Sequence, residues 1–519
     1  MRILLVAPAY SNFPVGIGYI SAALKNAGHQ ITCHTFANRR ILLELLQEPF
    51  DMVATGGLSF QLPQFEEIAE IVKASSKAWL VIGGGVVTSE PELITKLLSA
   101  DFSVLGEGEE TIVELASALE QKRDTTQLQG IAFPRDGKIV INSARSPIEL
   151  LDNLPRPDYE SFGFSEYLDR QNPTFACWDL FDFPRVYPLL ASRSCPYQCS
   201  FCYHPLGKKY RQRSISSILD EIRFAVRTFR INTFDIIDEL FAQEESRILE
   251  FCRQFKEFTK SLNGPIYFTC SLRVSDARDH LLQALKDAGC FMVNYGFESY
   301  SAHVLKSMKK YISPEQIHTA IHKTFAMKMS IQANFIFGDP EETLETAQVT
   351  LDFWKAHKWA GILLFMIIVC PDSELYQLCL KKGLIKNKLQ FIREDLFRPI
   401  NMTSLSDEKF ATLLARISEY THRYATYAIP VTKTKNEIQV QCPHCGENLK
   451  YKNFPNNRIF FCKMLHCRDC RKRFFSVTGL YKMYIRSLAS IIGPRTYRYL
   501  NVIKRMLKIV SPRAYYKIS

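Results

Sequence analysis

The sequence predicts an α/β protein in which an N-terminal doubly wound parallel sheet is followed by a partial (β/α)6 TIM-like barrel. Three observations predict this fold. The chain has 519 residues, which is long for one domain and suggests two or three. Short apolar runs alternate with helical patterns, as is typical of parallel sheets. Glycines or polar residues follow many of the apolar runs, where the ligands of such sheets bind.

The N-terminal third predicts a Rossmann-like sheet. We expect buried strands at 2–6, 52–55 and 80–82, with helices at 17–27 and 65–73. Glycines at strand ends let a flat ligand or a phosphate approach the backbone, although plain tight turns are the alternative. No G-x-G-x-x-G run precedes a helix, which weakens a nicotinamide or flavin interpretation. The ligand-side residues are Pro14, Gly16, Gly57, Ser59, Gly83, Gly84, Gly106, Glu107 and Gly108.

The central part predicts the barrel. Helical patterns separate six strand-like runs, which are Tyr187–Ser192, Thr233–Asp238, Pro265–Ser271, Phe291–Gly296, Ser330–Phe337 and Ile362–Val369. Chemistry in such barrels occurs at the C-terminal strand ends. Asp238, Glu298, Ser299 and Gly338 fall at these ends. A carboxylate there can accept hydrogen bonds from an amino group or a ribose, and helix N-capping is the alternative role.

A cysteine loop follows the first barrel strand. Cys195, Cys199 and Cys202 form a C-x3-C-x2-C run. Three thiolates on a cubane iron–sulfur cluster leave one iron open to bind a small molecule. Buried structural cysteines and a zinc site are the competing interpretations, but zinc usually takes four ligands, often as two C-x2-C pairs.

These cysteines, with Phe201 directly before the third, resemble the signature of the radical S-adenosyl-L-methionine (SAM) enzymes. The resemblance implies a 4Fe-4S cluster on Cys195, Cys199 and Cys202, whose open iron binds SAM. It implies reductive cleavage of SAM to a 5′-deoxyadenosyl radical, and a low-potential electron donor such as flavodoxin or ferredoxin. The residues implied to bind SAM are Phe201, Asp238, Glu298, Ser299 and Gly338.

The N-terminal third looks like the cobalamin-binding domain of one large radical SAM subfamily. The resemblance implies that cobalamin contacts the nine ligand-side residues given above. The D-x-H-x-x-G run that supplies a histidine to cobalt in some cobalamin proteins is absent. The implied activity is C-methylation of an unactivated carbon in a small-molecule or lipid-like substrate. Cyclisation or rearrangement is the alternative, and the catalytic residues are unknown.

The C-terminal part carries a second cysteine motif and most of the charge. Cys442, Cys445, Cys467 and Cys470 form two C-x2-C pairs, which predict a structural zinc site in a zinc-ribbon-like module. From residue 442 onward 17 Lys and Arg face two acidic residues, although the whole chain has a net charge of only +12.

A basic amphipathic pattern at 498–510 fits an anionic membrane or nucleic acid, whereas an ordinary helix docked on the barrel is the alternative. With the zinc-type module it would suit an RNA-modifying radical enzyme. An iron–sulfur sensor or scaffold is a further, non-enzymatic hypothesis.

The sequence divides into six expected parts. They are a cobalamin-binding domain at 1–147, a linker at 148–186, a radical SAM barrel at 187–400, a helical connector at 401–435, the zinc-ribbon-like module at 436–480 and a basic amphipathic tail at 481–519. The longest apolar stretch, 361–370, is about half of a membrane span. Fifteen cysteines without a secretion signal indicate a reducing compartment. We expect a cytoplasmic protein, peripheral at the membrane if the tail binds there.

Overall fold

The structure is a computed structural model that describes residues 1–9, 13–175, 177–262, 264–457 and 459–484. These residues form two compact units. The first unit contains residues 1–170, 185–251 and 368–398. The second contains residues 171–184 and 252–367 and the described residues from 399 onward. The six-part division expected from the sequence stays a prediction.

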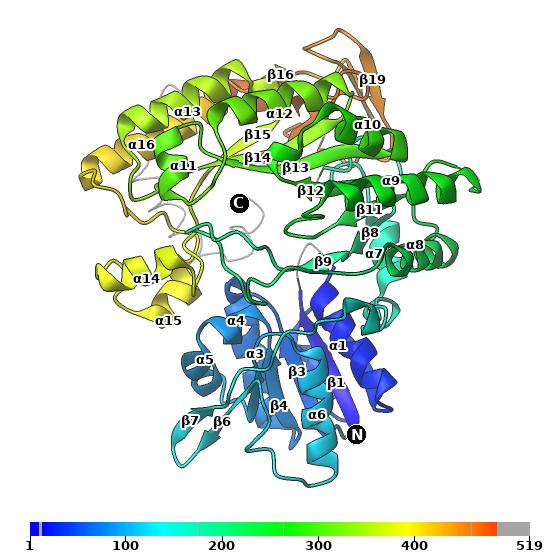
Figure 1. Cartoon of the computed structure of the whole chain (residues 1–519), viewed down its shortest axis with the longest axis vertical. Coiled ribbons are helices and arrows are strands. Elements are labelled where there is room, and N and C mark those ends of the chain that lie inside the picture. The colour runs from blue at the N-terminus through cyan, green and yellow to red at the C-terminus, as the bar shows by residue number, and fades with distance from the viewer. Residues whose placement is uncertain (10–12, 176, 263, 458, 485–519) are drawn as a thin grey trace. The chain divides into compact units, whose positions relative to one another are not determined.

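A seven-stranded sheet with the order β2-β1-β3-β4-β5-β6-β7 occupies the N-terminal part of the first unit (Figure 1). Neighbours from β2 to β5 are parallel, which confirms the predicted doubly wound sheet. Strands β6 and β7 continue the sheet antiparallel, which the sequence analysis missed. The strands are β1 (Arg2–Pro8), β2 (Gln30–Phe36), β3 (Met52–Gly56), β4 (Trp79–Gly83), β5 (Phe102–Val104), β6 (Ile131–Arg135) and β7 (Lys138–Ile141).

The missed hairpin has a recognisable turn. Asp136 and Gly137 connect β6 to β7, and both have positive φ angles, of 50° and 75°. Two consecutive left-handed residues make the tight turn that suits the twist of a two-stranded hairpin, and Asp-Gly is a favoured pair there. The Asp-Gly dipeptide was therefore the available signal.

Helices cover both faces of this sheet (Figure 1). Helix α1 packs against α6, whereas α2 packs against α3 and α4 against α5. The sheet order places β2 on one side of β1 and β3, β4 and β5 on the other. Because crossovers are right-handed, the helix that connects β1 to β2 covers one face of the sheet, and the helices of the later connections up to β5 cover the other. The helices are α1 (Val15–Asn26), α2 (Arg39–Leu45), η1 (Ser59–Gln61), α3 (Leu62–Ser75), α4 (Gly85–Ser89), α5 (Pro91–Leu97) and α6 (Glu109–Glu120).

The rest of the first unit contains the first barrel strands and three later helical segments. Strand β8 pairs parallel with β11, and β9 pairs antiparallel with β10. Helix α9 begins in the first unit and ends in the second. The elements are η2 (Leu151–Asn153), η3 (Glu160–Phe162), α7 (Phe164–Arg170), β8 (Val186–Leu189), β9 (Ser192–Arg193), β10 (Arg211–Gln212), α8 (Ile215–Phe229), β11 (Thr233–Ile236), α9 (Glu245–Lys260), α14 (Glu374–Lys381), α15 (Lys388–Gln390) and the π-helical turn η6 (Phe391–Asp395).

In the second unit, strands β12 to β15 pair in parallel and in chain order. Helices separate successive strands along the chain, so six strand–helix repeats run from β8 to β15 as predicted. The expected strand Ser330–Phe337 coincides with β14. The elements are β12 (Tyr267–Leu272), η4 (Val274–Asp276), α10 (Asp279–Ala288), β13 (Cys290–Glu298), α11 (Ala302–Ser307), α12 (Pro314–Ala326), β14 (Ser330–Phe337), α13 (Leu344–Ala356), η5 (Lys358–Ala360) and β15 (Ile362–Met366).

Helix α16 and two small sheets complete the second unit, with the strand orders β16-β21-β20 and β17-β18-β19. A separate apolar cluster that includes Val440, Tyr451 and Leu465 lies at their core. The elements are α16 (Asp407–Arg423), β16 (Tyr427–Ala428), β17 (Thr432–Lys433), β18 (Ile438–Gln441), β19 (Asn448–Tyr451), β20 (Cys462–His466) and β21 (Arg473–Val477).

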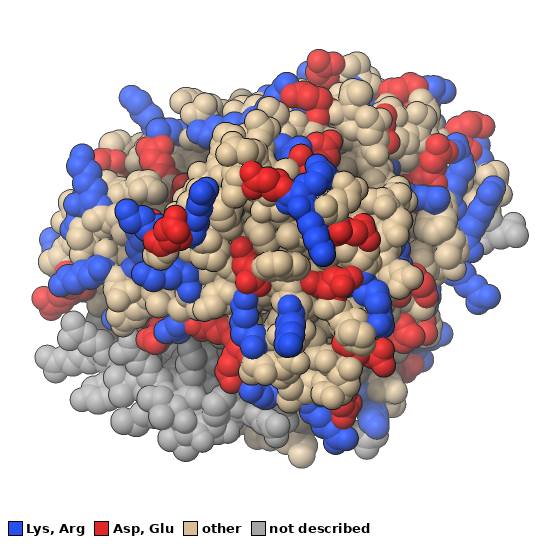
Figure 2. All heavy atoms as spheres, turned by 90° about the horizontal axis from the view of Figure 1, so that it is seen from below, with Lys and Arg blue, Asp and Glu red and all other residues tan. Residues whose placement is uncertain are grey.

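Charge on the described surface is mixed in sign. On the face that Figure 2 shows, basic and acidic side chains are interspersed, as expected from the near balance of charges before residue 442. The basic pattern at 498–510 lies outside the described residues. Among the helices that the structure describes, none has both the length and the apolar character needed to cross a membrane.

Candidate functional site: a cysteine loop and a sheet edge

The nine residues expected to contact cobalamin follow strands β1, β3, β4 and β5. Pro14 is the N-cap of α1, after β1, and Gly57 and Ser59 follow β3. Gly83 is the last residue of β4. Because these strands are parallel, their carboxyl ends share one edge of the sheet. The strand order reverses between β1 and β3, and such a switch point is where open α/β sheets bind ligands.

The glycines at this edge serve two different purposes. Gly84 has a φ of +85°, and a Cβ there would lie 2.7 Å from the backbone of Gly57. Close packing of two turns therefore explains this pair without a ligand. By contrast, nothing lies within 4 Å of a Cβ built on Gly16 or Gly106, and the buried Thr55 Oγ1 at the end of β3 has no hydrogen-bond partner. This open space and unsatisfied hydroxyl fit a ligand such as cobalamin.

The cysteine loop is closed by a two-stranded ribbon. Strands β9 and β10 pair antiparallel, with Arg193 opposite Arg211, and the three predicted ligands lie between them. The Cys202 amide donates to the Cys199 carbonyl at 3.1 Å. The Tyr203 hydroxyl donates to the Gly85 carbonyl at 2.8 Å, directly after the turn that follows β4. The loop is thereby attached to the ligand edge of the sheet.

Two polar side chains of this loop have buried atoms without a hydrogen bond, although His204 Nδ1 lies 3.9 Å from the Glu239 carboxylate. Ser200 Oγ and both ring nitrogens of His204 are buried without a hydrogen bond, and burial lowers the pKa of His204. Hydrogen bonds to cluster sulfurs are one way in which proteins tune iron–sulfur clusters. Three thiols with a nearby hydroxyl and imidazole therefore form a donor set that fits a 4Fe-4S cluster.

Four buried charges join the sheet edge to the same loop. Glu107 Oε1 lies 3.0 Å from Arg193 Nη1, and Glu107 Oε2 lies 2.8 Å from Arg211 Nη1. Glu109 Oε1 lies 2.5 Å from Arg193 Nη2, and Glu107 also accepts from the Ile148 amide at 2.6 Å. All four charged side chains are at most 7% exposed. We call these four residues the arginine–glutamate cluster.

Sequence analysis missed this role of Glu107, whose carboxylate is committed to the two arginines. Its expected contact with cobalamin stays a prediction. The available signal was Arg193, which ends a buried strand immediately before the cysteine loop. A buried arginine needs a carboxylate partner, but the sequence alone does not reveal which one.

Asp238 positions the entry to the cysteine loop. Its buried carboxyl accepts from the Ala191 amide and contacts the Ser192 hydroxyl, both at 2.8 Å. The same hydroxyl lies 2.8 Å from the Leu240 carbonyl. A hydroxyl has one hydrogen, so a proton on Asp238 would let both contacts form. Burial raises the pKa of Asp238 to about 7, which agrees with this arrangement. A direct contact with SAM stays a prediction.

We expect Asp238→Asn to change how stability depends on pH. The raised pKa means that the folded state holds this proton more tightly than the unfolded state between about pH 4 and pH 7. The wild type therefore loses stability as pH rises through this window, and the asparagine variant lacks that loss. Anaerobic thermal unfolding from pH 5 to pH 8 measures the Tm of both proteins. The Tm of the variant relative to that of the wild type should rise as pH increases. A pH-independent difference would contradict the assignment.

Of the five residues expected to bind SAM, Phe201 and Asp238 belong to the first unit, and the second unit holds the other three. Glu298 ends β13 with a φ of +59° at a register shift, and Lys310 Nζ lies 3.0 Å from its carboxylate. Ser299 Oγ contacts Thr350 Oγ1 at 3.2 Å, and Gly338 has a φ of +101° after β14. All three follow strand ends, as predicted.

Two buried atoms of the same sheet, Asn294 Oδ1 in β13 and Asp339 Oδ2 after β14, have no hydrogen-bond partner. They are available to a polar ligand. SAM binding at these strand ends stays a prediction.

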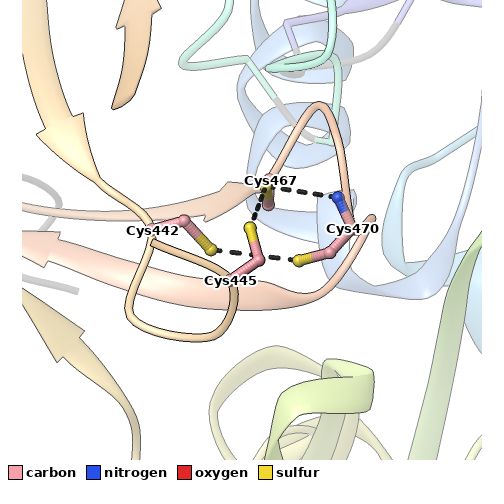
Figure 3. Close-up of side chains that lie close together, drawn as sticks. All are labelled: Cys442, Cys445, Cys467 and Cys470. Carbon is pink, nitrogen blue, oxygen red and sulfur yellow. Dashed lines mark hydrogen bonds between the residues drawn. The ribbon is translucent and has the colours of Figure 1, made fainter. Parts of the chain in front are cut away.

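The four C-terminal cysteines converge on one point (Figure 3). The Sγ atoms of Cys442 and Cys470 lie 3.9 Å apart, and those of Cys445 and Cys467 lie 3.6 Å apart. Four thiolates bound to zinc at about 2.3 Å in a tetrahedron would have their sulfurs about 3.8 Å apart. The geometry fits a structural zinc ion.

Two similar turns present these thiols. The Gly446 amide donates to the Cys442 carbonyl, and the Arg471 amide donates to the Cys467 carbonyl, each at 3.0 Å. Gly446 and Arg471 both have positive φ angles. His466, next to Cys467, pairs with Asp179 at 2.9 Å and is not part of the four-cysteine group. Each C-x2-C pair thus forms the same kind of knuckle.

We expect Cys467→Ser to lose one zinc ion per chain and to unfold at a lower temperature, because Cys467 is fully buried in the four-cysteine group. Metal analysis and thermal unfolding measure both effects. Cys462→Ser is the matched control, since Cys462 lies in β20 outside that group. Equal zinc content in the two variants would show that the four thiols do not hold the metal.

Two domain families match the chain. Residues 1–116 match the B12 binding domain, and residues 189–353 match the radical SAM superfamily. The first match covers the sheet edge described above, and the second contains the cysteine loop.

Curated relatives and solved structures extend these matches. An uncharacterized methyltransferase of Pyrococcus horikoshii is 26% identical over 376 residues, which are 68% of this chain and 78% of that protein. Anaerobic magnesium-protoporphyrin IX monomethyl ester cyclase of Rubrivivax gelatinosus is 27% identical over 407 residues, 73% of this chain and 70% of that protein. The structure of the radical SAM methyltransferase TsrM from Kitasatospora setae, with cobalamin and a 4Fe-4S cluster bound, has a TM-score of 0.63 at 18% identity. The superposition covers 74% of this chain and 78% of that chain. The likeness is one of fold.

Proposed function

We propose that this chain, which contains a B12-binding domain followed by a radical SAM domain, is a cobalamin-dependent radical SAM enzyme that methylates carbon in a small-molecule substrate. One observation carries the proposal. The cysteine loop is fastened to the sheet edge of the B12-binding domain by the arginine–glutamate cluster and by Tyr203. The proposed sites for the cluster and for cobalamin are thus coupled within one compact unit.

The chain's own residues would hold the cofactors. When bound, a 4Fe-4S cluster supplies the electron that cleaves SAM, and cobalamin supplies a carrier for the methyl group. Cys195, Cys199 and Cys202 are the proposed cluster ligands, and the Ser200 hydroxyl and His204 imidazole of the same loop would be available to hydrogen-bond to cluster sulfurs. Asp238 and the arginine–glutamate cluster hold the two ends of the loop, so the three cysteines would be presented in a fixed arrangement.

A second outcome is favoured by the relatives that are cyclases, among them that of Rubrivivax gelatinosus. Cyclisation would use the same radical without methyl transfer. The two outcomes differ in their products from SAM. Methylation consumes two SAM molecules: one yields S-adenosylhomocysteine, and the other yields 5′-deoxyadenosine and methionine. Cyclisation yields 5′-deoxyadenosine and methionine without S-adenosylhomocysteine. A low-potential electron donor is needed for either outcome. The described residues give no observation that favours nucleic acid or a membrane as a partner.

The test is anaerobic reconstitution of the full chain with iron, sulfide and hydroxocobalamin, followed by gel filtration. We expect cobalamin absorbance to elute with the protein, and reduced protein to convert SAM to 5′-deoxyadenosine and S-adenosylhomocysteine. Failure to retain cobalamin would remove the methyltransferase proposal and leave the radical chemistry. Failure to cleave SAM would overturn both.

A further inference from the structure

Three histidines of the second unit form a cluster at its surface. One imidazole nitrogen from each of His318, His322 and His357 lies within 4.8 Å of the others. His318 and His322 are exposed, and His357 is half-buried. Neutral imidazole is a ligand that suits divalent zinc, copper, nickel and iron.

Local structure explains why the three rings meet. His318 and His322 are four residues apart on α12, so their side chains lie one turn apart on the same helix face. His357 caps the C-terminus of α13. The two rings on α12 have centroids 4.2 Å apart, and the His357 ring stands nearly perpendicular to both, with centroids 5.6 Å away. The rings thus approach one point from two elements.

The third ring is held as metal ligands usually are. His357 Nδ1 lies 3.0 Å from the Phe353 carbonyl, which can only accept, so Nδ1 carries the hydrogen and Nε2 keeps its lone pair. Such a hydrogen bond to the second nitrogen orients metal-binding histidines and fixes their tautomer. The Phe353 ring stacks on His357 with centroids 4.1 Å apart. This imidazole is therefore preoriented before any metal binds.

The three histidines lie where a bound metal would stabilise the fold. His357 precedes β15 by a few residues, and His322 lies near the end of the helix that leads into β14. These are the N-terminal strand ends of the barrel, the side that contributes stability rather than chemistry.

The four-cysteine module contacts the same region. Arg473, in β21, donates to the Gly361 carbonyl at 2.5 Å, and Lys472 Nζ lies 4.8 Å above the Trp359 ring. Trp359 in turn packs against His322 and His357. A metal on the histidines would therefore stiffen the segment on which the module rests.

We propose that His318, His322 and His357 bind one divalent transition-metal ion, with Zn²⁺ as the expected occupant. Tetrahedral zinc with nitrogen ligands at about 2.0–2.1 Å has its ligand nitrogens about 3.3 Å apart. The ligand nitrogens lie within 4.8 Å of one another, so a bound ion would draw them closer together. Three histidines leave the fourth position to water, since His318 and His322 face solvent. The ion joins α12 to the connection between α13 and β15.

The test counts zinc in the full chain, reconstituted with its iron–sulfur cluster and free of any histidine tag. Equilibrium dialysis against Zn²⁺ alone, with zinc and iron measured separately, should give two zinc ions per wild-type chain. His318→Gln/His357→Gln should bind one, and Cys442→Ser/Cys467→Ser should also bind one. Combining the four substitutions should leave none. The readout needs no turnover, so it does not depend on the proposed function.

The matched control is His303→Gln, which changes an exposed histidine on α11 that pairs with Glu341 at 3.2 Å. It should retain both zinc ions. Circular dichroism checks that each variant is folded, and His318→Gln alone serves if the double histidine variant does not fold. Equal zinc content in the wild type and the folded histidine variants would overturn the proposal.

Discussion

Replacing Cys199 with alanine should lower the rate of reductive SAM cleavage by the reconstituted protein at least about a thousandfold. This corresponds to a barrier higher by about 4 kcal/mol. The C-x3-C-x2-C loop offers three thiolates, and the remaining two cannot hold a cluster with a single open iron. Iron and sulfide content should fall together with 5′-deoxyadenosine formation. Both are measured on the same anaerobic preparation.

Cys33→Ala is the control for the loss of a thiol as such. Cys33 is a half-buried cysteine in β2, outside the loop, so its removal should leave iron content and SAM cleavage near wild-type values. If Cys199→Ala kept its iron–sulfur cluster and its activity, the three cysteines would not be the ligands. This result would contradict the proposed function.

Glu107→Gln should destabilise the protein by about 3–5 kcal/mol, because it leaves two buried arginines facing one carboxylate. In the wild type, two guanidinium groups and two carboxylates balance in a nearly solvent-free cluster. The substitution keeps size and shape but removes the negative charge. Anaerobic thermal unfolding should show the loss as a lower Tm. Retention of iron should also fall, since Arg193 and Arg211 sit at the two ends of the cysteine loop.

Two further variants identify the cause. Glu110→Gln makes the same chemical change on a side chain that is 59% exposed and 3.9 Å from Arg145, so it should have little effect. Combining Glu107→Gln with Arg211→Gln restores the charge balance and should recover part of the lost stability. If Glu107→Gln and Glu110→Gln had the same Tm and retained the same amount of iron, the arginine–glutamate cluster would not stabilise the cysteine loop.

The sequence predicted the order of elements and the main motifs, because these depend on local patterns. Alternation of apolar runs and helical periods gave the parallel sheets, and the spacing of Cys442, Cys445, Cys467 and Cys470 predicted the convergence that the structure shows. The glycines at the ends of β3 and β4 were also placed correctly. Gly57 and Gly84 pack closely against each other, and their expected contact with cobalamin stays a prediction.

Long-range pairing could not be predicted. Glu107 meets Arg193 and Arg211 across 86 and 104 residues, and nothing in the local sequence links them. The histidine cluster escaped notice for the same reason, because His357 joins α12 only in three dimensions.

The arginine–glutamate cluster limits how freely the N-terminal domain can be exchanged. A hybrid enzyme that took this domain from a relative would place a foreign residue opposite Arg193 and Arg211. Unless the donor domain carried a carboxylate at the position of Glu107, the recipient would gain two poorly matched positive charges beside its cysteine loop. Substrate range in such hybrids should therefore be altered within the later part of the barrel, leaving this pairing of domain and loop intact.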